Sequence, residues 1–254
     1  DKSGFYYSRL EKEGPRVYYH QMGTDGTKDL EIFGKGFTRD KIIGAQVSED
    51  GHYLLITVFH GASGQKTEIY YQDLPFNGPI VPIVNDISAR FSPTIAGEHL
   101  FLQTNWDAPN GRVLDVDLKK PARENWREVI PKSDAVISGM TAAGRKLFVN
   151  YLQNVNSRVK VYEPDGKYVR EIAFPTIGTV SGMFGRWETN EAFYSFTSFH
   201  IPPTIYRYNI ETGTQSEWAR LKVPIQSGNF EVKQVWYESK DKTKNNDSYR
   251  PGKY

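Results

Sequence analysis

The stretch TIYRYNI at Thr204–Ile210 decides the fold, because its large apolar residues alternate with polar ones. Such alternation with a period of two is typical of a β-strand with one buried face. Comparable stretches occur earlier in the chain, so that five of them recur every 44 to 52 residues; they begin at Arg16, Glu68, Arg112, Arg158 and Thr204.

A second β-rich run precedes each stretch, and these runs cover residues 4–10, 52–59, 99–105, 146–152 and 192–198. A period of about 40 to 50 residues with several strands in each unit is typical of the blades of a β-propeller. We therefore predict an all-β fold, a β-propeller of about five four-stranded blades.

The second repeat displays the predicted order of a whole blade. An inner strand at 42–48 is followed by a turn at Asp50-Gly51, middle strands at 52–59 and 68–74, and an outer strand at 80–84. Gly51 suits the turn because glycine readily adopts a positive φ. The later inner strands are expected near 87–91, 136–141 and 179–184. The last two share a Ser-Gly-Met triplet, at 138–140 and 181–183, which we attribute to crowding around the propeller axis.

We predict one propeller domain over residues 1–238, with blades near 1–36, 37–85, 86–131, 132–174 and 175–226 and a further strand at 228–238. The first repeat lacks an inner strand, so the run 230–237 is expected to pair with it and close the ring. A closed ring predicts a monomer, whereas an open ring would form dimers or aggregates through its exposed strand edges. The polar tail 239–254 is expected to be disordered.

The composition excludes several classes of function. The chain has 254 residues and a net charge of +2 from 32 basic and 30 acidic residues, which gives no case for binding nucleic acid or an anionic membrane. Cysteine is absent and the five histidines are scattered, so we expect neither a metal site nor a cofactor. This composition is compatible with the cytoplasm, which is the predicted location. Because the chain begins at Asp1, we expect it to be a piece of a longer protein.

The sequence contains no recognisable catalytic motif. The segment Gly61–Gln65 comes nearest to a Gly-x-Ser-x-Gly nucleophile elbow but lacks the final glycine, so a hairpin loop is predicted there. A glycosidase would need carboxylates that converge on the axis, whereas Asp115 and Asp117 lie on a middle strand, where we expect them to be solvated. His60 and His200 each follow a Phe at the end of a strand and are expected to be solvated loop residues.

Three segments carry a resemblance to a known family: 104–113 (TNWDAPNGRV), 193–208 (FYSFTSFHIPPTIYRY) and 232–243, which includes VWYESKD. They resemble the propeller of the prolyl oligopeptidase family of serine peptidases, and the likeness runs from about residue 4 to residue 243. The resemblance implies a seven-bladed propeller that covers an α/β-hydrolase domain, whose Ser-Asp-His triad cleaves after proline in short peptides. This chain is similar to the third to seventh blades of that propeller.

The resemblance implies a function without catalysis by the chain as it stands, since no triad residue can be assigned to these 254 residues. We predict a propeller module that filters the access of oligopeptides to a hydrolase domain, with the peptide and that domain as its partners. The alternative from another class is a stand-alone propeller scaffold that binds a peptide or protein partner.

The resemblance also implies an apolar substrate subsite. The family's contact positions match Ile43 and the segment 59–62, so Ile43, Phe59 and Ala62 are the candidate substrate-binding residues. The alternatives are that Ile43 belongs to the core of the inner strand, as its residue type favours, and that Phe59 packs between blades.

Overall fold

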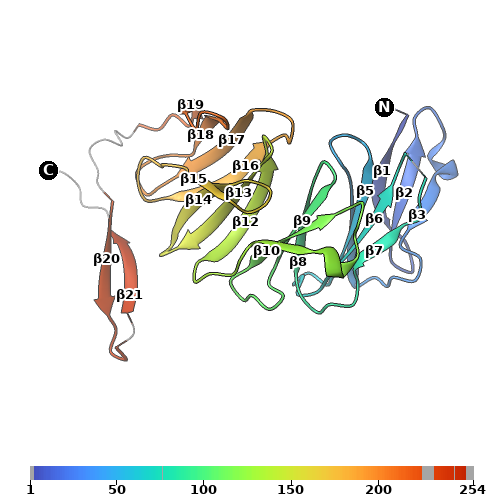
Figure 1. Ribbon diagram of the computed structural model, residues 1–254, viewed down its shortest axis with the longest axis horizontal. Helices are drawn as coiled ribbons and strands as arrows, with labels where there is room; N and C mark the ends of the chain where they lie inside the picture. The colour runs from blue at the N-terminus through green and yellow to red at the C-terminus, as the bar shows by residue number, and fades with distance from the viewer. Residues whose placement is uncertain (1–2, 76, 225–231, 243, 250–254) are drawn as a thin grey trace. The chain divides into compact units, whose positions relative to one another are not determined.

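The computed structural model describes residues 3–75, 77–224, 232–242 and 244–249 (Figure 1). The chain divides into two compact units, Asp1–Ser133 and Asp134–Tyr254. Each unit is built from antiparallel sheets whose strands pair in the order in which they occur along the chain. We describe the two units separately.

Unit 1 contains three sheets, which correspond to the first three predicted blades. The first consists of β1 (Gly4–Leu10), β2 (Pro15–Gln21) and β3 (Leu30–Phe33), with a short 3-10 helix η1 (Gly26–Lys28) before β3. The second consists of β4 (Lys41–Val47), β5 (Tyr53–His60), β6 (Thr67–Asp73) and β7 (Val81–Val84). The third consists of β8 (Phe91–Ala96), β9 (His99–Thr104), β10 (Arg112–Asp117) and β11 (Arg127–Ile130), with η2 (Arg123–Asn125) before β11.

The turn predicted at Asp50-Gly51 is confirmed. It joins β4 to β5, and Gly51 has a φ of +77°, in the region where glycine has no steric penalty. The Gly51 N–H donates to the carbonyl of Ser48, and the Ser48 N–H donates to the carbonyl of Tyr53. The turn therefore fixes the register in which Val47 lies opposite Leu54.

The core of unit 1 lies between its sheets, because both faces of the second sheet are covered. Even-numbered residues of β5, such as Leu54 and Ile56, pack with Val17 of the first sheet. Odd-numbered residues, such as Leu55, pack with Phe91 of the third sheet. This burial on both faces explains why β5 is almost continuously apolar, as buried strands usually are.

One predicted strand of unit 1 is displaced. The inner strand of the third blade was expected near 87–91, but β8 begins at Phe91 and ends at Ala96. Pro93 within this segment weakens the strand pattern, since proline cannot donate a hydrogen bond to a neighbouring strand. β8 is an edge strand of its sheet, where proline is tolerated because the N–H can face away from the ladder.

The expectation that Asp115 is solvated is wrong. Asp115 on β10 is only 1% exposed, whereas Asp117 two residues later is partly exposed. The Asp115 carboxylate is bound on one oxygen by His99 Nδ1 at 2.8 Å and on the other by Arg127 at 2.5 Å. A carboxylate can be buried at such a site because two charged or polar partners replace the water that it loses.

Unit 2 contains two four-stranded sheets that correspond to the fourth and fifth predicted blades. The fourth consists of β12 (Val136–Ala143), β13 (Lys146–Gln153), β14 (Asn156–Tyr162) and β15 (Tyr168–Glu171). The fifth consists of β16 (Thr179–Gly185), β17 (Glu191–Thr197), β18 (Thr204–Asn209) and β19 (Gln215–Arg220). Their facing surfaces form one core in which Phe148 meets Tyr208 edge to face, with ring centroids 5.9 Å apart.

The C-terminal segment forms a hairpin of β20 (Lys233–Glu238) and β21 (Lys244–Tyr249). The sequence prediction differs here in two respects: the strand at 228–238 was expected to join the first sheet, and residues 239–254 were expected to be disordered. β20 pairs instead with β21, and the first sheet consists of β1, β2 and β3. Residues 228–231, 243 and 250–254 lie outside the described part of the chain, so for these residues the predictions are not tested, and ring closure stays a prediction.

The all-β prediction with five blade-like sheets is confirmed, although the first sheet has three strands rather than four. In the described residues, helix is limited to two three-residue 3-10 turns, and none of it has the length or hydrophobicity to cross a membrane.

Candidate functional site

The three predicted subsite residues do not share one face of the second sheet. Ile43 on β4 lies opposite Val58, whereas Phe59 on β5 lies opposite Ile42. Residues directly opposite each other in an antiparallel pair point to the same face, and consecutive residues point to opposite faces. Ile43 is 4% exposed and belongs to the core shared with Val17 of the first sheet. The structure therefore favours the core alternative for Ile43.

Phe59 is the penultimate residue of β5, and Ala62 lies in the turn that follows this strand. Ala62 is exposed in the tight turn after β5, in which the Gly64 N–H donates to the carbonyl of Gly61. Phe59 is half-buried, and a Cβ added at Gly64 would lie 3.8 Å from its ring. The turn thus closes over the Phe59 ring, as expected for a hairpin loop rather than a nucleophile elbow.

His60, beside this turn, takes part in a polar cluster that the sequence did not predict. Its Nε2 lies 2.6 Å from Oε1 of Glu68, and the Tyr70 hydroxyl donates to Oε2 of Glu68 at 2.6 Å. The Glu68 side chain is 9% exposed, so these partners compensate for its burial. Burial, with the hydrogen bond to Glu68 as a second cause, raises the pKa of Tyr70 well above its usual value.

Ser198 and His200 in unit 2 form a serine–histidine contact, with Oγ and Nδ1 3.2 Å apart. The same Oγ accepts hydrogen bonds from the backbone N–H groups of His200 and Ile201, at 3.3 and 3.2 Å. Through these hydrogen bonds, Ser198 holds the backbone of the loop between β17 and β18 in place. A catalytic serine instead needs its hydroxyl hydrogen-bonded to a base that a third group orients.

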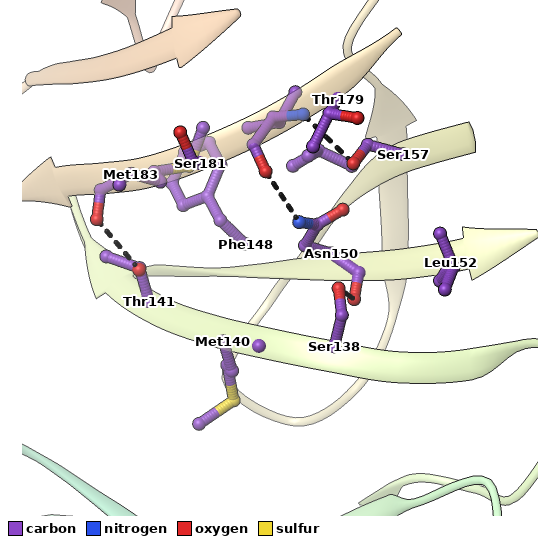
Figure 2. Close-up of a pocket in the computed structure, with 14 residues that line it drawn as sticks. Ser138, Met140, Thr141, Phe148, Asn150, Leu152, Ser157, Thr179, Ser181 and Met183 are labelled. Atoms are coloured by element: carbon purple, nitrogen blue, oxygen red, sulfur yellow. Dashed lines mark hydrogen bonds between the residues drawn. The ribbon is translucent and has the colours of Figure 1, made fainter. Parts of the chain in front are cut away.

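A cleft of about 410 Å³ lies in unit 2 between the inner strands β12 and β16 (Figure 2). β12 and β16 are each the edge strand of their sheet. Fourteen residues line the cleft, and none of them is charged. Figure 2 shows that they come from β12, β13, β14 and β16, so that the fourth and fifth blades both contribute.

Side chains of the fourth blade hold β16 in place along this cleft. The Ser157 hydroxyl accepts a hydrogen bond from the Val180 N–H at 3.0 Å, and Asn150 Nδ2 donates to the Val180 carbonyl at 3.4 Å. The Thr141 hydroxyl donates to the carbonyl of Met183 at 3.1 Å (Figure 2). Because backbone groups of an edge strand would otherwise need water, these bonds give the cleft a fixed wall.

The two Ser-Gly-Met triplets lie in the walls of the cleft, and crowding does not explain the first. A Cβ added at Gly139 would meet no atom within 4 Å, so space is open there. Gly182 has a φ of +59° within a bulge of β16, which gives it a conformational reason to be glycine. Crowding around the axis is therefore the wrong explanation for Gly139.

The chemistry of the cleft fits binding rather than reaction. Phe148 and Val159 are buried and apolar, whereas the hydroxyls of Ser138, Thr179 and Ser181 belong to exposed residues. No histidine, carboxylate or amine lines the cleft, so none of its hydroxyls has a general base within it. Elsewhere in the described residues, no group of three His, Asp or Glu side chains is arranged to hold a metal ion.

Five antiparallel blade-like sheets in chain order, four of them with four strands and the first with three, define this chain as a β-propeller domain. Residues 1–220 match the family model described as the prolyl oligopeptidase N-terminal β-propeller domain. The chain therefore belongs to the prolyl oligopeptidase family and represents its propeller, and the resemblance noted in the sequence is confirmed.

The curated relatives are longer than this chain. It is 32% identical to the prolyl endopeptidase of Elizabethkingia meningoseptica in an alignment of 253 positions that covers 95% of this chain and 36% of that protein. It is 30% identical to prolyl oligopeptidase A of Galerina marginata in an alignment of 269 positions that covers 96% of this chain and 36% of that protein. The chain thus spans little more than a third of the length of these relatives.

Solved structures agree with this assignment. A structure from a mechanistic analysis of two prolyl endopeptidases superposes with a TM-score of 0.88 at 29% identity, covering 100% of this chain and 39% of that chain. Ligand-free prolyl oligopeptidase B from Galerina marginata also gives a TM-score of 0.88 at 29% identity, covering 100% of this chain and 37% of that chain.

Proposed function

We propose that this chain is the non-catalytic propeller part of a prolyl oligopeptidase-like serine peptidase, in which it filters the access of oligopeptides to a hydrolase domain. The observation that carries the proposal is the match of residues 1–220 to the family's N-terminal propeller domain, together with the limited share of each relative that the chain covers. The stand-alone scaffold is not favoured, because the likeness to these peptidases extends over nearly the whole chain.

The physical basis of a filter is a rigid wall with a narrow passage. The cores between neighbouring sheets of each unit are apolar and close-packed, so each unit resists the opening that a folded protein would require. An extended peptide, by contrast, needs only a passage the width of one chain. The proposal thus assigns discrimination by size to the propeller and bond cleavage to the hydrolase domain.

Two of the predicted contact residues remain candidates for the substrate side of the propeller. Phe59 is half-buried below the turn that carries the exposed Ala62, so an apolar peptide side chain could reach both. Ile43 contributes to the core of the opposite face, and we expect its substitution to change stability before it changes substrate binding.

The experiment is a segment exchange in the prolyl endopeptidase of Elizabethkingia meningoseptica, in which this chain replaces the segment that it matches. The kcat/KM is measured for a short proline-containing peptide and for the same sequence within a folded protein. The proposal predicts that the exchanged enzyme cleaves the short peptide and spares the folded protein, as the parent enzyme is expected to do. A folded, active exchange enzyme that cleaves both equally would overturn it.

A further inference from the structure

The cleft between β12 and β16 has the properties of a ligand site that the filter function alone does not require. Its volume of about 410 Å³ lies within the range of roughly 300 to 1,000 Å³ that is usual for ligand pockets. Its lining includes the buried apolar side chains of Phe148 and Val159 and the exposed residues Ser138, Thr179 and Ser181, which carry hydroxyls. An apolar lining with a small number of placed polar groups is the usual composition of such pockets.

The absence of charged residues from the cleft limits the class of ligand that can bind there. None of its lining residues is charged, so a charged group that entered would lose water without gaining a counter-ion. Neutral groups lose less on leaving water and can use the hydroxyls of Thr179 and Ser181, each of which can donate or accept a hydrogen bond. The Ser138 hydroxyl donates to the Asn150 carbonyl at 3.0 Å and can still accept a hydrogen bond. The ligand should therefore be uncharged and should carry both donors and acceptors.

The strands that form the walls favour an extended chain. β12 is an edge strand, and the edge of a sheet offers backbone N–H and C=O groups to an added strand. On β16 the Val180 and Met183 backbone groups are already bound by the fourth blade, so β12 is the strand that an extended chain would follow. Met140 and Met183 also line the cleft, and the flexible methionine side chain adapts to apolar groups of different shape. An extended peptide with small or apolar side chains meets all of these conditions.

We propose that the cleft between β12 and β16 is a docking site for an uncharged, extended stretch of an oligopeptide. The proposal rests on the proposed function, because it identifies where a peptide admitted by the propeller is held. The cleft would then select peptides by charge, because stretches that carry acidic or basic side chains would not bind there. This selection would act in addition to the selection by size that the propeller provides.

Gly139 offers a direct test, because a larger residue there would fill the cleft. A Cβ at Gly139 meets nothing within 4 Å, and the same is true of Gly44 on β4, in unit 1. Neither glycine has a positive φ, so neither substitution strains the backbone. Gly139→Phe is therefore the blocking variant and Gly44→Phe its matched control.

The probe is the blocked neutral peptide acetyl-Gly-Val-Pro-Ala-Ala-amide, titrated into the 254-residue chain by calorimetry. We expect Gly139→Phe to weaken binding at least tenfold and Gly44→Phe to leave it within twofold. A peptide with Glu in place of Val should bind at least tenfold more weakly to the unchanged chain. If Gly139→Phe does not fold, Ser181→Ala replaces it as the test variant. Ser181→Ala removes one hydroxyl from the cleft and is expected to weaken peptide binding severalfold.

Equal binding to the unchanged chain and to folded Gly139→Phe would overturn the proposal, and so would the absence of binding at millimolar peptide. The segment-exchange enzyme separates this failure from failure of the proposed function. If that enzyme still spares the folded substrate while the cleft binds nothing, the docking site is wrong and the filter stands. If it loses its discrimination by size, the proposed function itself has failed.

Discussion

Replacing Asp115 by asparagine tests whether the buried polar cluster of the third blade stabilises unit 1. The carboxylate of Asp115 is 1% exposed and binds His99 through one oxygen and Arg127 through the other. Asparagine has almost the same shape but carries no charge and has only one acceptor oxygen, so its amide N–H₂ faces either Arg127 or His99. The variant thus removes the negative charge that strengthens the hydrogen bonds of Asp115, without leaving a cavity.

The expected loss of stability in Asp115→Asn depends on how exposed its partners His99 and Arg127 are. A hydrogen bond to a charged group contributes about 1.5 to 3 kcal/mol, and the side chain of Arg127 is 61% exposed, so solvent weakens its share. We expect a loss of about 2 kcal/mol, which corresponds to a fall in Tm of about 4 to 8 °C for a protein of this size. Thermal unfolding followed by tryptophan fluorescence reports on this region, because Trp106 and Trp126 pack against the core of the second and third blades.

Asp117→Asn is the matched control, since Asp117 lies two residues further along the same strand and is partly exposed. Its Oδ1 accepts a hydrogen bond from the Lys119 N–H at 2.9 Å, and an asparagine oxygen can accept the same bond. We expect a change below about 0.5 kcal/mol. Equal shifts in Tm for the two variants would refute the reasoning, because both aspartates would then behave as solvated side chains.

Two further predictions concern other parts of the chain. Phe148→Ala should destabilise unit 2 by about 3 to 5 kcal/mol in urea unfolding, because it empties a buried site and removes the contact with Tyr208; a loss below about 1 kcal/mol would contradict the packing described for this core. The hydrogen bond from Tyr7, and in addition the contact with His20, lowers the pKa of Asp29. This carboxylate therefore adds stability above its unfolded pKa of about 3.9, and the addition is lost as the pH falls through the lower folded value. The difference in urea midpoint between Asp29→Asn and the parent protein should therefore be smaller at pH 3 than at pH 5. An equal difference at the two pH values would contradict this prediction.

The strands were predictable because their pattern is local. β1 begins and ends at the predicted residues, and the middle strands of the other blades lie within one or two residues of their predicted positions. β8 was misplaced because Pro93 breaks the apolar pattern within a strand whose edge position tolerates it. The hairpin of β20 with β21 was missed because β21 is polar, and pairing rather than composition makes it a strand.

The candidate site was predictable only in part, because it depends on contacts between distant residues. Ile43 and Phe59 were grouped because the family resemblance implied it, and only the register revealed that they point to opposite faces. The cleft that Gly139 lines is also lined by β16, which begins forty residues later in the chain. The cytoplasmic location and the oligomeric state stay predictions.

The central claim is that these residues form a propeller that does not itself cleave peptides, and labelling with a serine-directed fluorophosphonate tests it most directly. The 254-residue chain and the full-length prolyl endopeptidase of Elizabethkingia meningoseptica are incubated with the reagent and weighed by mass spectrometry. The account predicts a stoichiometric mass increase for the endopeptidase and none for this chain. A stoichiometric label on one serine of this chain, accompanied by hydrolysis of a proline-containing peptide, would contradict it.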